Sequence, residues 1–329
     1  MRDCVVVFAQ REDIHAERLC SELSNLGARA LRIDAEDIDQ LRISFRNGRF
    51  VFGLNDKTFC ADDIKSVFVR RRPTSKDFGN FENKADANVS EYVALQKEML
   101  LQDAFFSLQE TARFYNSFDA TSRFMGKLTQ DLIARRVGLN VAETLIGSSD
   151  EEVIDFIKNI NDRGARVCTK PLAQKNLIRD GQLFTRYTEV LDDSIDIHSE
   201  DFESCPIIFQ EYVQKAYELR ITVADTRVVA VRIDSQLAPG ETKTDWRKYN
   251  IPKTPHSKYT LPGELVEQLL NFHKVTGLRY SAFDFIKSPD GRYVFLETNP
   301  SGQWLWLENI TGIPITREIA VALCSDSNT

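Results

Sequence analysis

The 329-residue sequence predicts an α/β protein built from three lobes. Residues 4–33 alternate an apolar strand-like run, an amphipathic helix and a second strand-like run, which is a typical opening of an α/β sheet. The final third holds several more strand-like runs, and two of them, 280–286 and 293–299, are joined by a short turn. A chain of this length also exceeds what one hydrophobic core usually covers, so several compact lobes are expected.

Local signals place elements within these lobes. The Asn47-Gly48 pair between apolar alternations predicts a tight hairpin. Helical periodicity predicts one continuous helix across 122–138, and an apolar run predicts a strand at 166–170. The expected lobes are an N-terminal lobe at 1–115, a central lobe at 116–195 and a C-terminal lobe at 196–329.

Composition excludes several classes of protein. A formal net charge of −7 does not supply the massed positive surface of a general nucleic-acid binder, so no nucleic-acid partner is expected. No apolar run approaches the roughly 20 residues of a membrane span and the N-terminus lacks a secretory signal, so we expect a cytoplasmic protein without a membrane partner. Six cysteines without a CxxC pair and four scattered histidines favour neither a disulfide framework nor a His-based site. The chemistry is therefore expected in carboxylates, lysines and arginines.

Three oxygen-bearing side chains stand on the last two predicted strands. Asp284 lies on the first strand, while Glu297 and Asn299 are two residues apart and share one face of the second. Antiparallel pairing of the two strands would bring all three together. Such hard oxygen ligands suit Mg²⁺, which takes waters and nucleotide phosphates as its other ligands. The sequence therefore predicts a magnesium site, and a solvated sheet face is the weaker alternative.

Two lysines precede these carboxylates. Lys127 lies on a predicted helix, and Lys170 ends a predicted strand immediately before Pro171. From such positions an ammonium group can reach phosphates as a point charge. Each lysine alone is more commonly a surface residue. Their order along the chain gives them weight, since a nucleotide cleft between two lobes needs cations on the smaller lobe.

A third group of residues lies on the strands between 207 and 234. The backbone at Gln210-Glu211-Tyr212-Val213 can bind a flat heteroaromatic ring, and the carboxylate of Glu218 can bind ribose hydroxyls. Arg220 shares a strand face with Glu218, and Arg232 is expected to aim at the same cleft from the neighbouring strand. A salt-bridged amphipathic hairpin is an equally weighted alternative for any one of these residues.

In chain order, these pieces resemble the ATP-grasp superfamily over roughly residues 115–322. The shared order is a lysine, a second lysine before proline, a QEY segment, an acid-x-Arg strand, and a final Asp with Glu-x-Asn. The resemblance implies that Lys127 and Lys170 contact ATP phosphates, that 210–213 holds adenine and that Glu218 binds ribose. It also implies that Asp284, Glu297 and Asn299 bind Mg²⁺, with Arg220 and Arg232 in catalytic roles.

A closer resemblance, to the microviridin-type ligases that cross-link graspetides, covers nearly the whole chain. It rests on RRRP at 70–73, on IDSQLAPGETKTDWRKYN at 233–250 and on NPSGQWLWLENITGIPI at 299–315. It implies a three-lobe ATP-grasp fold with an N-terminal pre-ATP-grasp lobe. It further implies an enzyme that joins Asp or Glu side chains of a ribosomal precursor peptide to hydroxyls or amines, giving lactones or lactams. The RRRP run departs from the expected aromatic before two arginines.

The precursor peptide would carry an acidic core, which local positive charge can attract. The expected substrate-binding residues are Arg70, Arg71, Arg72, Asp245, Trp246 and Arg247. At least one arginine of the 70–72 run is expected to pair with the protein's own acids instead. Trp304 and Trp306 are expected in the core rather than in a peptide groove.

Two other functions remain open on the sequence. One is a carboxylate–amine ligase that acts on a free amino acid or a protein C-terminus, as the ribosomal-protein glutamate ligases do, and the TDWRKY segment and tryptophan-rich end argue against it. The other is a module that binds ATP without ligation, against which stands the full set of metal ligands, lysines and Arg220. The family resemblance also suggests a homodimer.

Overall fold

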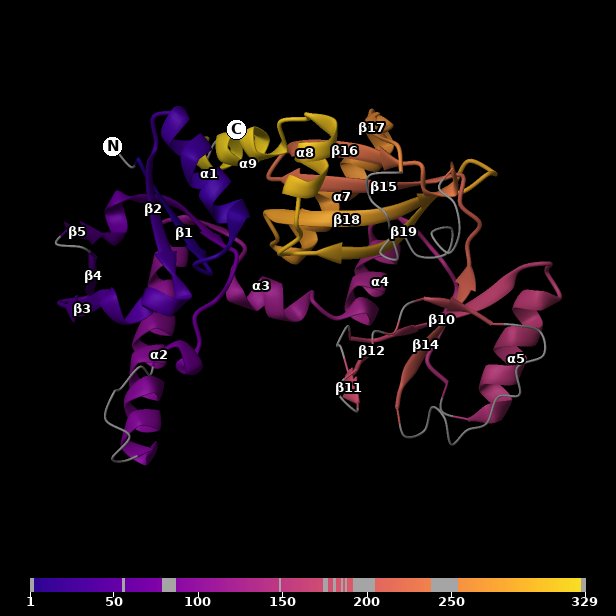
Figure 1. Ribbon diagram of the computed structural model, residues 1–329, viewed down its shortest axis with the longest axis horizontal. Helices are drawn as coiled ribbons and strands as arrows, with labels where there is room; N and C mark the ends of the chain where they lie inside the picture. Colours follow the sequence, from indigo (N-terminus) through magenta and orange to yellow (C-terminus); the bar gives the residue numbers. More distant parts are fainter. Residues whose placement is uncertain are drawn as a thin grey trace.

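The computed structural model describes residues 3–54, 57–78, 87–147, 149–173, 177–179, 182–184, 186, 188–191, 205–237 and 254–326. Within these ranges the protein is α/β, with several separate sheets covered by helices (Figure 1). The N-terminal sheet lies beside a six-stranded sheet, and a smaller sheet lies below the latter in the view of Figure 1. No helix among these residues is both long and apolar enough to cross a membrane.

The N-terminal sheet is parallel, and its strands are β1 (Cys4–Ala9), β2 (Arg29–Asp34), β6 (Ile64–Val69) and β7 (Arg113–Tyr115). Their order is β2-β1-β6-β7. Every residue of β1 is buried, which explains its unbroken apolar run, because a central parallel strand is covered on both faces. The carboxyl ends of β1 and β6 both lead into the loops that reach the C-terminal part of the chain.

A helix and a small antiparallel sheet accompany the N-terminal sheet. The elements are α1 (Ile14–Asn25), β3 (Arg42–Arg46), β4 (Arg49–Leu54), β5 (Lys57–Cys60) and α2 (Ala87–Gln109). Asp13 caps α1 by accepting from the backbone N–H groups of His15 and Ala16. The predicted hairpin is confirmed, since Asn47 and Gly48 have φ of 51° and 79° and join β3 to β4.

The six-stranded sheet has the order β17-β16-β15-β18-β19-β8. Its strands are β8 (Asn140–Val141), β15 (Tyr217–Ala224), β16 (Arg227–Ile233), β17 (His256–Tyr259), β18 (Tyr280–Lys287) and β19 (Tyr293–Asn299). Among the described residues, four helices cover it: α4 (Lys127–Arg136), α7 (Gly263–Thr276), α8 (Leu305–Thr311) and α9 (Ile315–Cys324). The first two pack on one face with the apolar side chains of β15 and β18, and the last two pack on the other.

The continuous helix predicted across 122–138 is wrong. The chain forms α3 (Phe118–Arg123), leaves helical geometry, and begins α4 at Lys127 with Gly126 as the N-cap. The side chain of Gln130 donates to the carbonyls of Phe124 and Thr298 at 2.7 Å each and ties this break to the end of β19. The periodicity continues through the break, whereas a buried polar contact decides where the helix is interrupted.

The smaller sheet is antiparallel, in the order β13-β10-β14-β9. Its elements are β9 (Thr144–Leu145), β10 (Arg166–Pro171), β13 (Glu189–Val190) and β14 (Ile207–Tyr212), with α5 (Asp150–Asn161) packed on it. A separate pair is formed by β11 (Leu177–Arg179) and β12 (Gln182–Phe184).

One hydrophobic core joins the two ends of the chain. Helix α9 packs on α1 and β6 as well as on β16, and the same cluster includes Trp304, fully buried as expected. Trp306 is half-buried. The helix α8 was not predicted. The three lobe ranges stay a prediction, and the cores show that α4 packs with the six-stranded sheet although the central range contains it. A homodimer also stays a prediction.

Candidate functional site

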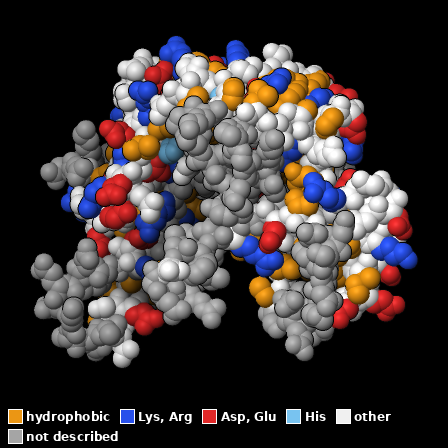
Figure 2. Space-filling view, turned by 45° about the vertical axis from the view of Figure 1, so that its right-hand side comes forward, with side chains coloured by type: hydrophobic (Ala, Val, Ile, Leu, Met, Phe, Trp, Pro, Cys, Tyr) orange, Lys and Arg blue, Asp and Glu red, His pale blue; other side chains and the backbone are white. Residues whose placement is uncertain are grey.

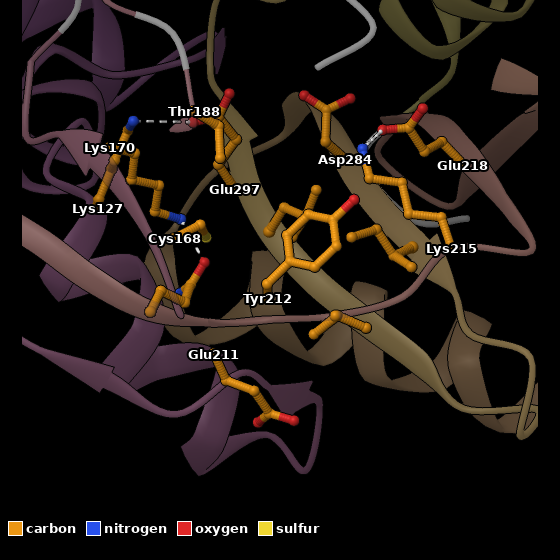
Figure 3. Close-up of a pocket in the computed structure, with 14 residues that line it drawn as sticks. Lys127, Cys168, Lys170, Thr188, Glu211, Tyr212, Lys215, Glu218, Asp284 and Glu297 are labelled. Atoms are coloured by element: carbon orange, nitrogen blue, oxygen red, sulfur yellow. Dashed lines mark hydrogen bonds and ion pairs between the residues drawn. The ribbon is translucent and has the colours of Figure 1, made fainter. Parts of the chain in front are cut away.

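A cavity lies between the smaller sheet and one face of the six-stranded sheet (Figure 3). It holds about 680 Å³ of empty volume, part of which is open to solvent. Its lining residues are Lys127, Cys168, Lys170, Thr188, Gln210, Glu211, Tyr212, Val213, Lys215, Glu218, Asp284, Ile286, Leu296 and Glu297. Most of the expected ATP and metal residues are therefore gathered in one place, although they come from six different elements and one connecting segment.

Two carboxylates face each other across β18 and β19. Asp284 is the direct partner of Glu297 in the antiparallel register, so both side chains stand on the same face. Asp284 accepts from the guanidinium of Arg220 at 2.7 Å, and Glu297 is 3.6 Å from the ammonium of Lys127. This face of the sheet, which carries Glu218, Arg220, Asp284 and Glu297, is called the cavity face below.

The donors fit a magnesium ion that also binds phosphates. Among the residues that the structure describes, no three His, Cys, Asp or Glu side chains gather around one point, so protein carboxylates alone do not close a metal shell. Mg²⁺ in nucleotide sites uses one or two carboxylates with waters and phosphate oxygens. Asn299 pairs with Ala282 at the end of β19, at the rim and outside the cavity lining, and its amide oxygen accepts from the backbone of Ser301 at 2.9 Å.

Both expected lysines point into the cavity, Lys170 from the smaller sheet and Lys127 from the start of α4 (Figure 3). The ammonium of Lys127, at the start of α4, donates to the carbonyl of Pro171 at 3.1 Å. That of Lys170, on β10, donates to the side-chain oxygen of Gln210 at 2.8 Å. Two ammonium groups thus stand opposite two carboxylates, an arrangement that can hold a polyphosphate and its metal between them.

The segment at 210–213 forms the floor that connects the two sheets. Tyr212 and Val213 line the cavity, whereas the side chain of Glu211 points away from the other lining residues in Figure 3. The backbone N–H of Glu211 donates to the carbonyl of Glu143. The guanidinium of Arg166 lies 5.1 Å from the centre of the Tyr212 ring. Glu211 can therefore serve a ligand with its backbone only.

A buried ion pair with a spare acceptor stands on the other side of the cavity. The ammonium of Lys215 lies 2.6 Å from one carboxylate oxygen of Glu218, and both side chains are buried. The second oxygen of Glu218 is buried and has no hydrogen-bond partner among the residues that the structure describes. A buried acceptor left in this way is costly unless a ligand supplies the donor. This orphaned oxygen can accept a hydrogen bond from a hydroxyl group of a ligand.

Sequence reasoning missed several lining residues. Lys215 was overlooked although it precedes Glu218 by three residues, and Ile286 alternates with Asp284 along β18. Cys168 alternates with Lys170 along β10, and burial raises the pKa of its thiol to about 11, so it remains a neutral side chain. Thr188 and Leu296 carried no sequence signal.

The expectation that Arg232 aims at the same cleft is wrong. Arg232 is the antiparallel partner of Leu219, not of Arg220, so its side chain leaves the opposite face of the sheet. Its guanidinium lies over the ring of Tyr217, 4.0 Å from the centre, and contacts Asp234 at 2.5 Å. Its neighbour in space, Arg220, does stand on the cavity face. The sequence does not show which residues of β15 and β16 pair, and a shift of one residue in this register moves a side chain to the other face of the sheet.

The arginines at 70–72 also differ from expectation. The side chain of Arg70 is largely buried, and its guanidinium donates to Asp13 and to two backbone carbonyls. Arg71 contacts Asp77 at 2.7 Å, and Arg72 lies over the ring of Phe118. At least one pairs with the protein's own acids, as expected. Asp245, Trp246 and Arg247 lie outside the described residues. Figure 2 shows basic and acidic side chains interspersed over the N-terminal elements.

The sequence and the fold were compared with known proteins. A model of the RimK-like ATP-grasp domain matches residues 127–323. That range begins at Lys127 and includes every residue of the cavity lining. No protein of curated function matches the sequence.

Solved structures similar to this chain extend the match beyond that domain. A RiPP-associated ATP-grasp ligase of Chryseobacterium gregarium, in complex with ADP and a leader and core peptide, has a TM-score of 0.82 and 26% identity over 98% of this chain and 96% of its own. The macrocyclase MdnC of Microcystis aeruginosa MRC, bound with precursor peptide MdnA, has a TM-score of 0.76 and 26% identity over 97% and 98%. D-cycloserine synthetase DcsG shares the fold at 13% identity and a TM-score of 0.55.

Proposed function

Because the chain belongs to the RimK-like ATP-grasp family, we propose that it is an ATP-dependent, ADP-forming ligase that activates side-chain carboxylates of a ribosomal precursor peptide. The activated groups condense with Ser or Thr hydroxyls or with Lys amines, giving macrolactone or macrolactam links. One observation carries the proposal: two ammonium groups, two facing carboxylates and the orphaned oxygen of Glu218 line one cavity.

The cavity suggests a position for each part of ATP. The floor at 210–213 would receive adenine, Glu218 the ribose, and Lys127 and Lys170 the phosphates. Asp284 and Glu297, with Asn299 at the rim, would hold Mg²⁺. When bound, the metal supplies charge that neutralises the phosphates during transfer.

The reaction follows in two steps from this arrangement. A peptide carboxylate attacks the terminal phosphorus of ATP, so that ADP leaves and an acyl phosphate forms. A peptide hydroxyl or amine then attacks the acyl carbon, phosphate leaves, and the nucleophile loses its proton. Arg220, which pairs with Asp284 on the cavity face and lies just outside the cavity lining, would stabilise negative charge on the transferring phosphoryl group. A well-positioned nucleophile needs little further activation against an acyl phosphate.

The choice of a peptide substrate rests on the extent of the similarity. The two peptide-bound ligases match this chain over at least 96% of either length, including the N-terminal sheet. The ATP-grasp fold alone does not select a peptide, because a D-cycloserine synthetase shares it. We therefore expect the peptide to be recognised by the N-terminal part of the chain and by the surface at the rim of the cavity.

Intact-mass spectrometry tests the proposal directly. The purified protein is incubated with ATP, Mg²⁺ and a precursor peptide encoded near its gene. Successive losses of about 18 Da from the peptide, one water for each bond, together with ADP release are expected. ADP formed only with free amino acids would instead indicate the carboxylate–amine ligase. No mass change and no ADP under either condition would indicate a module that binds ATP without ligation.

A further inference from the structure

Arg70 links the N-terminal sheet to the loop that follows β19. This loop, residues 299–304, begins at the expected metal ligand Asn299 and ends at Trp304. The guanidinium Nη1 of Arg70 donates to the carbonyl of Ser301 at 2.8 Å and to that of Gly302 at 3.3 Å. Its Nε donates to the carboxylate of Asp13 at 3.1 Å. One buried cation therefore joins the start of α1 to the edge of the candidate active site.

Burial makes these contacts strong. The side chain of Arg70 is 7% exposed, and that of its counter-ion Asp13 is 12% exposed. The guanidinium also lies over the indole ring of Trp304, 5.1 Å from its centre. A buried charge of this kind persists only when its hydrogen bonds are satisfied, and here two of its acceptors are backbone carbonyls of the loop. The loop and Arg70 are therefore energetically dependent on each other.

The loop in turn contacts the residues of the cavity face. A Cβ added to Gly302 would lie 2.9 Å from Nη2 of Arg220 and 2.4 Å from Cβ of Ala282. The backbone at this position thus lies close to the guanidinium that binds Asp284, with no room between them for a side chain. The carbonyl of Gly302 also accepts from the hydroxyl of Tyr280 at 2.6 Å. Any displacement of Gly302 would change the space available to Arg220.

The same loop fixes the side chain of Asn299. Its amide oxygen accepts from the backbone N–H of Ser301, and its carbonyl accepts from that of Gly302 at 3.1 Å. Arg70 holds the carbonyl groups of the same two residues. The orientation of Asn299 is therefore set by a turn whose outer side is held by Arg70.

We propose that Arg70 is a positioning residue for the nucleotide–metal site: by holding Ser301 and Gly302 it fixes Asn299 and Arg220 from the N-terminal sheet. The inference rests on the proposed function, since it takes Asn299 and Arg220 to serve Mg²⁺–nucleotide. It also gives the first of the three arginines a role other than binding the peptide. Residues that orient a metal ligand from behind commonly change metal affinity by about 10- to 100-fold when they are removed.

Arg113 provides a matched control. It too is a buried arginine of the N-terminal sheet that pairs with an aspartate, Asp225, and donates to two backbone carbonyls, those of Leu323 and Ser325. Those carbonyls lie at the end of α9 and outside the cavity lining. Arg113→Ala therefore removes the same kinds of contact as Arg70→Ala without touching the loop at 299–304.

The experiment compares wild type, Arg70→Ala, Arg70→Lys and Arg113→Ala. Calorimetry measures the affinity for Mg²⁺–ADP without peptide, and ADP formation is then measured against Mg²⁺ concentration with peptide. Arg70→Ala is expected to weaken Mg²⁺–ADP binding at least about tenfold relative to Arg113→Ala. Arg70→Lys, which keeps the charge beside Asp13 but can hold fewer acceptors, should lose a smaller factor, with a melting temperature close to that of wild type.

Two results would overturn the inference. Equal losses of Mg²⁺–ADP affinity in Arg70→Ala and Arg113→Ala would show a general structural role. If Arg70→Ala fails to fold, wild-type Mg²⁺–ADP affinity in Arg70→Lys would also show a general structural role. The lysine cannot make the two carbonyl contacts and the ion pair together, so a positioning role requires a loss of affinity in this variant. Failure of the proposed function looks different, since wild type itself would then bind no Mg²⁺–ADP.

Discussion

The two faces of the six-stranded sheet have opposite characters although the same strands form them. On the cavity face stand Glu218, Arg220, Asp284 and Glu297, each of which takes part in an ion pair. On the other face, called the core face here, β15, β18 and β19 present Leu219, Phe283, Phe285 and Phe295 to α4 and α7. Neighbours along a strand, such as Phe283 and Asp284, therefore serve different purposes.

This sheet separates the residues that stabilise the fold from those that carry charge. Strand alternation places every second side chain in the apolar layer, where close packing determines stability. The remaining side chains are free to carry charge, because α8, α9 and the N-terminal sheet cover only part of the cavity face. Mutations on the two faces are therefore expected to affect different measurements, turnover on one and unfolding free energy on the other.

Glu297→Gln should have the largest effect on the cavity face. Loss of a metal-binding charge is expected to lower ADP formation by about 10³-fold, or about 4 kcal/mol in the barrier, while the melting temperature stays within a few degrees of wild type. Glu211→Gln is the control, since that side chain points away from the cavity. Undiminished turnover in Glu297→Gln would remove this residue from the magnesium site.

Phe283→Ala should have the largest effect on the core face. Phe283 is fully buried and contacts Phe272, Phe285 and Phe295, so truncation should lower the unfolding free energy by about 3–5 kcal/mol. Phe45→Ala, at a side chain that is 59% exposed, should change it by less than about 0.5 kcal/mol. Denaturant unfolding measures both. A large change in the KM for ATP of folded Phe283→Ala would break the separation of the two faces.

Acid should weaken the core face through His273. This imidazole donates to or accepts from Ser281 at 2.7 Å and lies over Phe283, and burial lowers its pKa to about 3. Folding favours the neutral imidazole. Its contribution to the unfolding free energy is therefore complete above pH 6.5 and is lost as the pH falls towards 3. At pH 5 the loss is about 2 kcal/mol. Unfolding of His273→Gln should show correspondingly less dependence on pH, and an unchanged dependence would contradict this account.

Arg232→Ala should have the smallest effect. Its cation–π contact with Tyr217 and its ion pair with Asp234 are partly exposed, so the loss of unfolding free energy should be about 1 kcal/mol or less. ADP formation should remain within about threefold of wild type, whereas Arg220→Ala on the cavity face should lower it at least about 100-fold. Equal losses of ADP formation in the two variants would return Arg232 to the active site.

Periodicity, turn preference and residue type are enough to predict the local elements and the chemistry of the residues. The apolar run of β1, the Asn47-Gly48 hairpin and the two strands that carry Asp284 and Glu297 follow from periodicity and turn preference, which act over a few residues. The order of lysines, QEY segment and carboxylates indicated the ATP-grasp family before any contact was known. Such local signals contain no information on the register between distant strands or on the packing between lobes.

Long-range packing, by contrast, sets the face that each arginine occupies and holds the loop at residues 299–304. Arg220 and Arg232 look alike in sequence, yet they lie on opposite faces of the sheet. The antiparallel register decides this, because a shift of one residue reverses the face. Arg70 reaches Ser301 across 231 residues of chain, and the break between α3 and α4 depends on a contact from Gln130 to Thr298. These contacts are long-range, and they form because burying a charge or an amide requires partners that only the assembled lobes supply.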